Sequence, residues 1–350
     1  MKSIIVTMLA LFIVCKMQGK IPTSLKTYYH CVNQAELALM DSNYSSAINF
    51  YKKAFAHKKS PFIKDRFNLA LCYAIQNKFR KCYDQLIPII DKGGSVHQIM
   101  KRPEFSDFFN SLFGSKLIIY QSSHKRTYNL QYRATLDSLI AIDQKFRKMK
   151  GGYEIYSDTI RKIDSLNVIT LNQLIAQYGF PSEDLVGVDT SLLLIRPIYS
   201  VLIIHQQSGS PNRFWNYSDL ISQALNTGDI EVHAAAEYIW KCSGKDKMGV
   251  MDAGLVQLIL DTISSESSSN IKPDRASQPL GYFKMSPEKE KSVNTARDSL
   301  GLETIFDARR KTAFMQNNHR FILPSSTVSV LVCSSQAQYD KMVKSIIWIE

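Results

Sequence analysis

The apolar and polar positions of the first half follow the spacing of amphipathic helices. Residues 28–90 contain two similar helix–turn–helix patterns in which small and aromatic residues recur at matching offsets. Tyr44 of the first pattern corresponds to Phe79 of the second, and Ala47 corresponds to Cys82, a repeat of 35 residues in both cases. Small residues at such positions allow close helix approach, and aromatic residues fill the space between helix pairs. The pattern therefore predicts two stacked helical hairpins.

Helical spacing continues in the second half. Arg133–Met149 has apolar residues three or four positions apart, which predicts one helix. A second helical run reaches Tyr178, where Gly179 followed by a proline should end it. A further helix is expected over Glu231–Trp240. A last closing helix of the first half is expected over Val96–Phe113.

The C-terminus has a different pattern. Thr327–Cys333 is β-branched and apolar, as a strand would be, while Lys341–Glu350 fits either a second strand or an amphipathic helix. The predicted fold is mainly α, with tetratricopeptide-like helical hairpins and a second helical domain, to which a small C-terminal β-hairpin could be added. The predicted boundaries are 28–113 for the repeats, 114–132 for a linker, 134–325 for the second helical domain and 326–350 for the strand or helix extension.

Residues 1–19 have the pattern of a secretory signal peptide. A lysine at position 2 precedes an apolar run from Ile4 to Val14, which is too short to span a bilayer. We therefore expect an exported protein, periplasmic or secreted, without a transmembrane span. Lipid anchoring through Cys15 is the less favoured alternative, because Val14 stands where a lipoprotein signal has a small residue.

The amino-acid composition indicates which classes of partner the protein could bind. The 350 residues carry 43 Lys and Arg against 31 Asp and Glu, a formal charge of +12. A basic chain suits nucleic acid or an acidic envelope polymer. The basic residues are scattered, however, and not interleaved with aromatic residues, so solvated helix faces explain them better. We expect no nucleic-acid partner, and a protein or cell-envelope partner instead.

The cysteines do not indicate a metal site or a cofactor. The six cysteines include no C-x-x-C spacing, so no zinc site is predicted. Buried free thiols are expected in preference to disulfides. No phosphate-binding loop, metal motif or nucleophile elbow occurs in the sequence, and we predict neither a metal nor a cofactor.

Six short motifs occur in a fixed order in the second half. They are D-Q-x-x-R from Asp143, D-x-x-N from Asp164, G-x-P…V-G from Gly179, the pair His205-Gln206, G-D-I from Gly228 and R-x-x-L-G-L from Arg297. This order resembles an uncharacterised bacterial domain family of unknown function, over residues 134–307. The family tends to have Gln-His where this chain has His205-Gln206. Residues 28–113 resemble tetratricopeptide repeats, which recur every 34 residues.

The motif residues include groups that could do chemistry. Asp164 and His205 are the candidate catalytic residues, since a carboxylate and an imidazole can act as orienting group and base. Asp143, Arg147, Asn167 and Gln206 are the candidate binding residues. A structural account competes with this one: Asp143 and Arg147 could form a helix-stabilising pair, Asp164 and Asn167 could cap a helix start, and His205 could belong to the core.

Two functions are therefore compatible with the sequence. The first, which we favour from the sequence, is a non-catalytic module that binds a protein or an envelope component through the repeats. The alternative is a hydrolase-like enzyme using Asp164 and His205. An enzyme should bring these two residues together in a pocket, whereas a binding module should have an exposed groove along residues 28–113. A structural envelope protein without a specific ligand is a third option that the sequence does not separate from the first.

Overall fold

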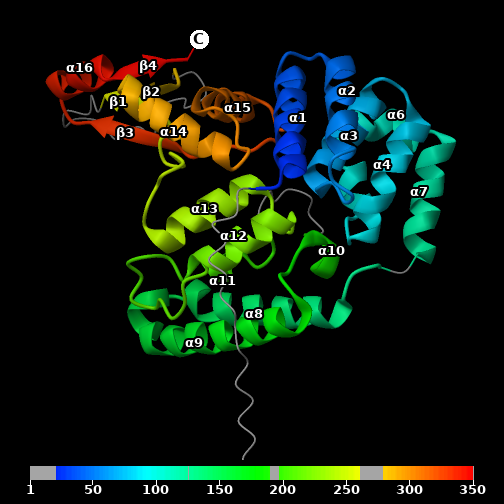
Figure 1. The fold of residues 1–350 in the computed structure, drawn as a ribbon, viewed down its shortest axis with the longest axis horizontal. Helices are drawn as coiled ribbons and strands as arrows, with labels where there is room; N and C mark the ends of the chain where they lie inside the picture. Colours follow the sequence, from blue (N-terminus) through cyan, green and yellow to red (C-terminus); the bar gives the residue numbers. More distant parts are fainter. Residues whose placement is uncertain (1–20, 125, 190–196, 261–278, 350) are drawn as a thin grey trace, which may run out of the picture.

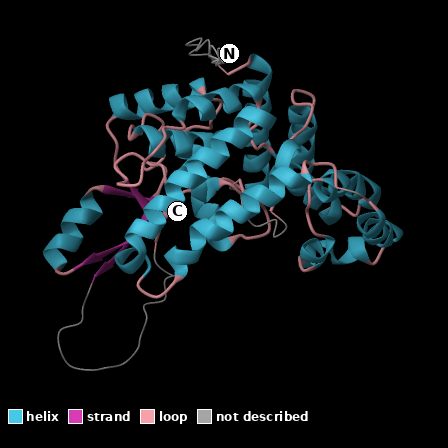
Figure 2. Ribbon diagram, turned by 90° about the horizontal axis from the view of Figure 1, so that it is seen from below, coloured by secondary structure: helices cyan, strands magenta, loops and turns pink. Residues whose placement is uncertain are grey.

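The computed structural model describes residues 21–124, 126–189, 197–260 and 279–349. The predicted export segment, Cys15 and the polar insertion 264–278 lie outside these residues. The described chain is mainly helical and carries one small sheet at one end (Figures 1 and 2), which confirms the predicted mainly α fold with a small strand element. No described helix combines the length and the apolar character that a membrane span requires.

Two helical hairpins begin the described chain. The turn of the first contains Ser42 with φ of 55°, and the turn of the second contains Asn77 with φ of 54°, so the left-handed turn residues recur after 35 positions like the side-chain pattern. Asn43 caps the second helix of the first hairpin by accepting a hydrogen bond from the Ser46 amide. The helices are α1 (Thr23–Met40), α2 (Tyr44–Phe55), α3 (Ile63–Ile75) and α4 (Phe79–Asp91).

The segment after α4 differs from the prediction of one closing helix. It is divided into short pieces, because Pro103 cannot continue a helix and starts a new turn instead. A regular helix returns only at α7, which extends to Ser123 and so gives helical structure to the first part of the stretch 114–132 that we expected to be a linker. The elements are α5 (Val96–Met100), η1 (Pro103–Phe105), α6 (Ser106–Phe109) and α7 (Leu112–Ser123).

Two long helices form one side of the second half. α8 (Leu130–Lys148) and α9 (Gly152–Tyr178) lie side by side (Figure 1), and α9 ends at Gly179 as predicted. Asn129 caps α8 by accepting a hydrogen bond from the Tyr132 amide. The shorter helices that pack above them are α10 (Glu183–Val186), α11 (Ser200–Ile204), α12 (Ser218–Thr227) and α13 (Val232–Ser243).

The sheet corrects the prediction of a C-terminal hairpin. Its strand order is β3-β1-β2-β4, so the two C-terminal strands lie at opposite edges and do not pair with each other. Strands from within the predicted helical domain fill the centre: β1 pairs with β3 in parallel and β2 pairs with β4 antiparallel. The elements are β1 (Leu255–Leu260), β2 (Gly281–Phe283), α14 (Pro287–Ser299), α15 (Ile305–Asn317), β3 (Val328–Cys333), α16 (Gln336–Lys344) and β4 (Ile346–Trp348).

The second half of the chain covers the side of the repeats formed by α1 and α3. Figure 1 shows α15 beside α1. Asn68 of α3 exchanges two hydrogen bonds with the backbone of Ile322, at 2.8 and 2.9 Å. Apolar residues from both halves belong to one core cluster. The repeats therefore use this side to hold their own chain.

A buried network of charges joins the two halves. Glu36 of α1 accepts hydrogen bonds from Lys64 at 3.0 Å and from Lys311 of α15 at 2.5 Å, and all three residues are buried. The network continues to His233, whose two ring nitrogens lie 2.7 Å from Glu231 and from Glu303. Buried charges need partners of this kind, because their removal from water is costly.

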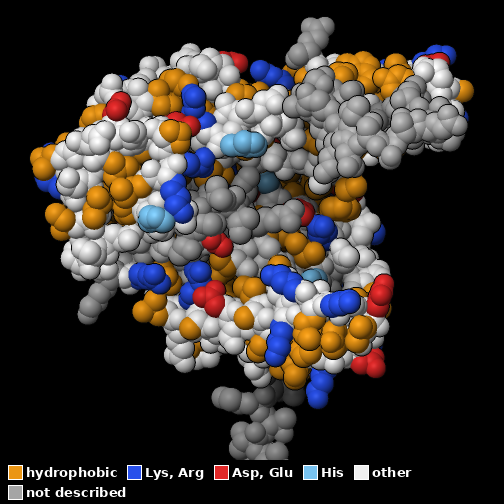
Figure 3. All heavy atoms as spheres, turned by 180° about the vertical axis from the view of Figure 1, so that it is seen from behind, with side chains coloured by type: hydrophobic (Ala, Val, Ile, Leu, Met, Phe, Trp, Pro, Cys, Tyr) orange, Lys and Arg blue, Asp and Glu red, His pale blue; other side chains and the backbone are white. Residues whose placement is uncertain are grey.

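The basic residues do not gather on the face drawn in Figure 3. Lys and Arg side chains are spread there among apolar and acidic ones. The five cysteines within the described residues are free thiols, four of them buried, as expected from their spacing.

Candidate functional site

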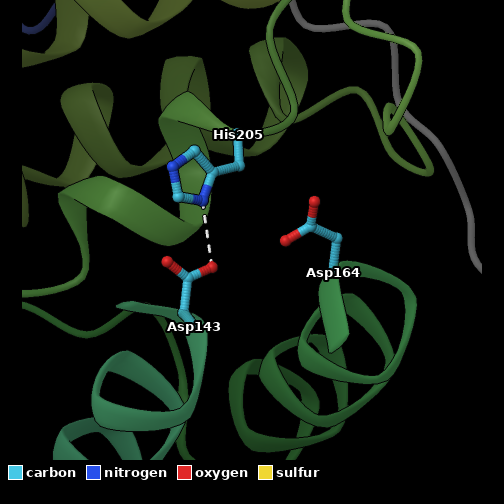
Figure 4. A group of neighbouring side chains, drawn as sticks. All are labelled: Asp143, Asp164 and His205. Atoms are coloured by element: carbon cyan, nitrogen blue, oxygen red, sulfur yellow. Dashed lines mark hydrogen bonds and ion pairs between the residues drawn. The ribbon is translucent and has the colours of Figure 1, made fainter. Parts of the chain in front are cut away.

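Three of the predicted site residues meet where α8, α9 and the end of α11 come together. Asp143 projects from α8, Asp164 from α9 and His205 from the residue after α11 (Figure 4). One side-chain atom of each lies within 4.8 Å of the other two. The candidate residues therefore converge, although they are up to 62 positions apart in the sequence.

The structure excludes the predicted capping role of Asp164 and Asn167. Both residues lie in the middle of α9, where the backbone N–H groups are already hydrogen-bonded within the helix. They are three residues apart, so they share one face of the helix, and both are buried. This face is turned toward α8 and His205.

Arg147 binds both aspartates. Its Nη2 donates to the two oxygens of Asp164 at 2.7 and 2.8 Å, and its Nη1 lies 3.1 Å from Oδ1 of Asp143. The predicted pair of Asp143 and Arg147 is thus present, but it is part of a larger cluster. Each carboxylate is 1% exposed and Arg147 is 16% exposed, so the guanidinium neutralises charge in a place that water hardly reaches.

His205 is oriented by Asp143. Its Nδ1 lies 2.9 Å from Oδ1 of Asp143, and Gln144 donates to the other oxygen at 2.8 Å. Burial alone would raise the pKa of Asp143, but the hydrogen bonds from His205 and Gln144 and the charge of Arg147 hold it below its ordinary value. An ionised Asp143 fixes the proton on Nδ1 and leaves Nε2 as the acceptor nitrogen. The imidazole is 23% exposed, so this is where the cluster reaches solvent.

Residues 206–216 close over Asp164. The buried Asn212 donates from Nδ2 to Oδ2 of Asp164 at 2.8 Å. Gln206 holds this segment in place, since its Oε1 accepts hydrogen bonds from the amides of Phe214 and Trp215. The predicted binding residue Gln206 therefore supports the site indirectly.

The cluster borders a narrow recess in which the side chains leave no space for a water molecule. Two of the residues that line it carry a polar group without a hydrogen-bond partner, namely Nδ2 of Asn167 and the hydroxyl of Tyr217. Their side chains are at least nine-tenths buried, with 6% and 0% exposure. Buried donors without partners are uncommon in native proteins, because each costs about 1–3 kcal/mol.

Asp143, Asp164 and His205 have side chains of types that can bind a metal ion. The guanidinium of Arg147, however, already supplies the positive charge between the two carboxylates. All four carboxylate oxygens accept hydrogen bonds or ion pairs from Arg147, His205, Gln144 or Asn212. A metal ion would have to displace these donors. The arrangement fits acid–base chemistry on an organic ligand better than metal binding.

The sequence missed two residues of this site. Asn212 lies in a polar segment without periodicity, and Tyr217 directly precedes α12, so neither had a signal that distinguished it from a loop residue. Gln144 belonged to the D-Q-x-x-R motif but was not among the candidate site residues. His233 of α13, a further residue that the sequence did not single out as functional, bridges two glutamates of the buried network.

Comparison with protein-family models, curated proteins and solved structures finds no match for this chain. The two resemblances therefore remain predictions.

Proposed function

We propose that the second half of the chain carries an acid–base site for a small organic ligand and acts as a hydrolase. The observation that carries the proposal is the meeting of Asp143, Arg147, Asp164 and His205 in one buried cluster that reaches solvent at the imidazole. The sequence alone favours a binding module, whereas the convergence of these four side chains supports the hydrolase.

In this proposal His205 is the base. Its Nε2 takes a proton from a water molecule that attacks the carbonyl carbon of an ester or amide, and it returns this proton to the leaving group. Asp143 holds the ring and stabilises the imidazolium, as its 2.9 Å contact to Nδ1 allows. The products are a carboxylic acid and an alcohol or amine. Arg147 and Asp164 position the ligand beside the imidazole.

Binding through an open groove of the repeats has less support. The side of α1 and α3 is covered by residues of the same chain, including Lys311 and Ile322. A cavity of about 50 Å³ exists elsewhere, but Phe62 is its lining residue from the first half and the others come from residues 181–231. The expected groove along 28–113 is thus filled where it would be formed by α1 and α3.

The hydrolase proposal is tested with small aryl esters such as 4-nitrophenyl acetate, since the imidazole is only 23% exposed and the recess beside it is too narrow for a large acyl group. We expect His205→Asn to lower kcat/KM about 100-fold. The matched control is His97→Asn, because His97 is exposed and any exposed imidazole hydrolyses this ester slowly. Equal rates for wild type and His205→Asn would overturn the proposal.

A second candidate, the binding of another protein, is favoured by one observation on α7. This last helix of the first half exposes Leu112, Ile118 and Ile119 at 67%, 45% and 64%. The end of a repeat stack needs a polar cap or a partner. We expect Ile119→Glu to lose a partner that wild type captures from the envelope fraction of the source cell, while Lys116→Glu keeps it. If Ile119→Glu and Lys116→Glu capture the partner equally well, the exposed apolar surface of α7 is not its binding site.

We also propose that the protein is exported, whichever of the two functions it has. It is supported by the apolar run 4–14 behind a positive start. Sequencing of the mature protein should find Lys20 as the first residue, after cleavage behind Gly19. A mature protein that still begins at Met1 would contradict export by this route.

A further inference from the structure

We propose that the turn between α8 and α9, residues 145–155, docks on an anionic lipid surface. Three apolar side chains at this turn are exposed to solvent and stand among exposed lysines. These side chains belong neither to the hydrolase cluster nor to the apolar surface of α7. Exposed apolar clusters mark contact with a partner or a membrane, because apolar area in water is costly.

The α8–α9 turn lies at one end of a long helix pair. At the other end, the Tyr132 hydroxyl near the start of α8 donates to the carbonyl of Gly179, just after α9, at 3.3 Å, so the two helices run antiparallel. α8 has 19 residues and is therefore about 28 Å long. The turn thus lies far from the connection to the first half of the chain (Figure 1).

The turn has a defined conformation before any surface binds. Gly151 and Gly152 have φ of 82° and 36°, which favour glycine, and the Gly152 amide donates to the Met149 carbonyl at 2.9 Å. Phe146 of α8 packs against Tyr156 of α9 across the turn, with ring centroids 5.4 Å apart. A turn that is already ordered loses little conformational freedom on binding.

Three apolar side chains extend from this turn into solvent. Met149, Tyr153 and Ile155 are 42%, 45% and 65% exposed. Ile155 lies against the turn itself, since a Cβ atom built on Gly151 would come within 2.2 Å of its Cδ1. A tyrosine ring suits the boundary between headgroups and acyl chains, because its ring is apolar and its hydroxyl is polar.

The lysines of the turn give it a positive charge. Lys145, Lys148 and Lys150 are exposed, and among the described residues none of them has an ion-pair partner. Glu154 is the one acidic residue between 145 and 155, and Arg147 is held by the buried aspartates. Lysine side chains can keep their charge at the headgroups while apolar neighbours enter the bilayer interface.

The small size of the turn favours a lipid surface over an acidic protein. A stable protein–protein interface buries about 800 Å² on each partner, which is more than one helix–helix turn offers. A bilayer makes no such demand, because a few inserted side chains and a few lysines act together on many headgroups.

The first experiment measures co-sedimentation of the full-length protein with vesicles of phosphatidylcholine, alone or mixed with equal parts of phosphatidylglycerol. We expect binding to the mixed vesicles that weakens in high salt, because salt screens the lysines. Each lysine near an anionic surface strengthens binding about fivefold, so Lys148→Glu/Lys150→Glu should bind at least about 25-fold more weakly. Ile155→Glu should bind at least about tenfold more weakly, since a carboxylate replaces an inserted apolar group.

Matched controls come from exposed residues on other helices. Ile119→Glu places the same carboxylate on α7, and Lys52→Glu/Lys53→Glu reverses two lysines on α2; both variants should keep vesicle binding. All variants share the apolar run 4–14, so its contribution to lipid binding is the same in each. Equal vesicle binding by wild type, Ile155→Glu and Lys148→Glu/Lys150→Glu would overturn the proposal, and so would equal binding of wild type to both kinds of vesicle.

A local measurement shows whether the turn itself enters the lipid. Tyr153→Trp keeps an aromatic side chain there, and the three tryptophans of the wild type give the fluorescence background. We expect brominated phosphatidylglycerol to quench additional emission in Tyr153→Trp, and no additional quenching would overturn the proposal. Binding to soluble polyglutamate that is lost in Lys148→Glu/Lys150→Glu, without binding to vesicles, would overturn it in favour of an acidic protein partner.

Discussion

Removal of Arg147 should show how strongly the two aspartates depend on its charge. In Arg147→Met the side chain keeps a similar length and loses three contacts to carboxylate oxygens, of 2.7, 2.8 and 3.1 Å. Ligand atoms of Asp143 and Asp164 lie within 4.8 Å of each other, so their repulsion would be about 3.5 kcal/mol at an effective dielectric constant of 20. Breaking a buried ion pair from one side costs about 3–5 kcal/mol in measured cases.

We therefore expect Arg147→Met to lower the free energy of unfolding by about 3–5 kcal/mol at pH 7. The assay is urea denaturation, followed by circular dichroism, between pH 5 and pH 7. The loss should shrink toward pH 5, because one aspartate can then take up a proton at a cost that falls by about 1.4 kcal/mol per pH unit. Arg161→Met is the control, since the hydrogen bond of Arg161 to the Pro211 carbonyl is exposed and should contribute less than about 1 kcal/mol.

The same variant tests whether the guanidinium takes the place of a cation. With Arg147 gone, Oδ1 of Asp164 has lost its donor and the cluster has lost its cation, so a divalent ion has to displace only neutral donors. Zn²⁺ should therefore restore part of the lost Tm in Arg147→Met but not raise Tm of the wild type. A variant as stable as the wild type at pH 7, or a control that loses as much, would refute this account of the cluster.

Three further predictions concern the buried network and the closing segment. Lys311→Met leaves a buried glutamate with one partner fewer and should lower the free energy of unfolding by about 3–5 kcal/mol in urea; a change below 1 kcal/mol would contradict the network. Burial alone would lower the pKa of His233, but its two glutamates raise it from 6.5 to about 9, so its stabilising contribution is full below pH 6.5 and is lost as pH rises through 9. The urea midpoint should fall over that range in the wild type and stay level in His233→Gln, and equal slopes would refute the pKa assignment. Asn212→Ala removes one of the two donors to Oδ2 of Asp164 and should raise kcat/KM for 4-nitrophenyl acetate several-fold while costing about 1 kcal/mol of stability; a lower kcat/KM would mean that Asn212 supports the site rather than closing it.

The helices and half of the site follow from local spacing. The 35-residue period placed both turns of the repeats, because a packed hairpin needs its small residues and its left-handed turn at fixed offsets. Asp143 with Arg147, and Asp164 with Asn167, each share a helix face at spacings of four and three residues. Local spacing does not predict which helix faces contact each other. The two faces are brought together by the packing of α8 against α9.

The remaining features depend on contacts between distant residues. Lys64 and Asp65 look like surface charges in the sequence, and only the packing of α15 against α1 buries them with Glu36 and Lys311. They stand in a run of three charged residues with Arg66 at the start of α3, so no local signal marks them as buried. The strand order of the sheet could not be predicted from the sequence either. Strands close in sequence usually pair, but β1 and β2 lie between the two C-terminal strands.

The most direct test of the central claim is a double-mutant cycle on ester hydrolysis. The rates of wild type, Asp143→Asn, His205→Asn and the double variant are compared with 4-nitrophenyl acetate at pH 7. Because Asp143 acts through the imidazole, we expect the double variant to be no slower than His205→Asn alone, with either single change costing at least tenfold. Two small and additive losses would contradict the claim that these residues form one catalytic unit.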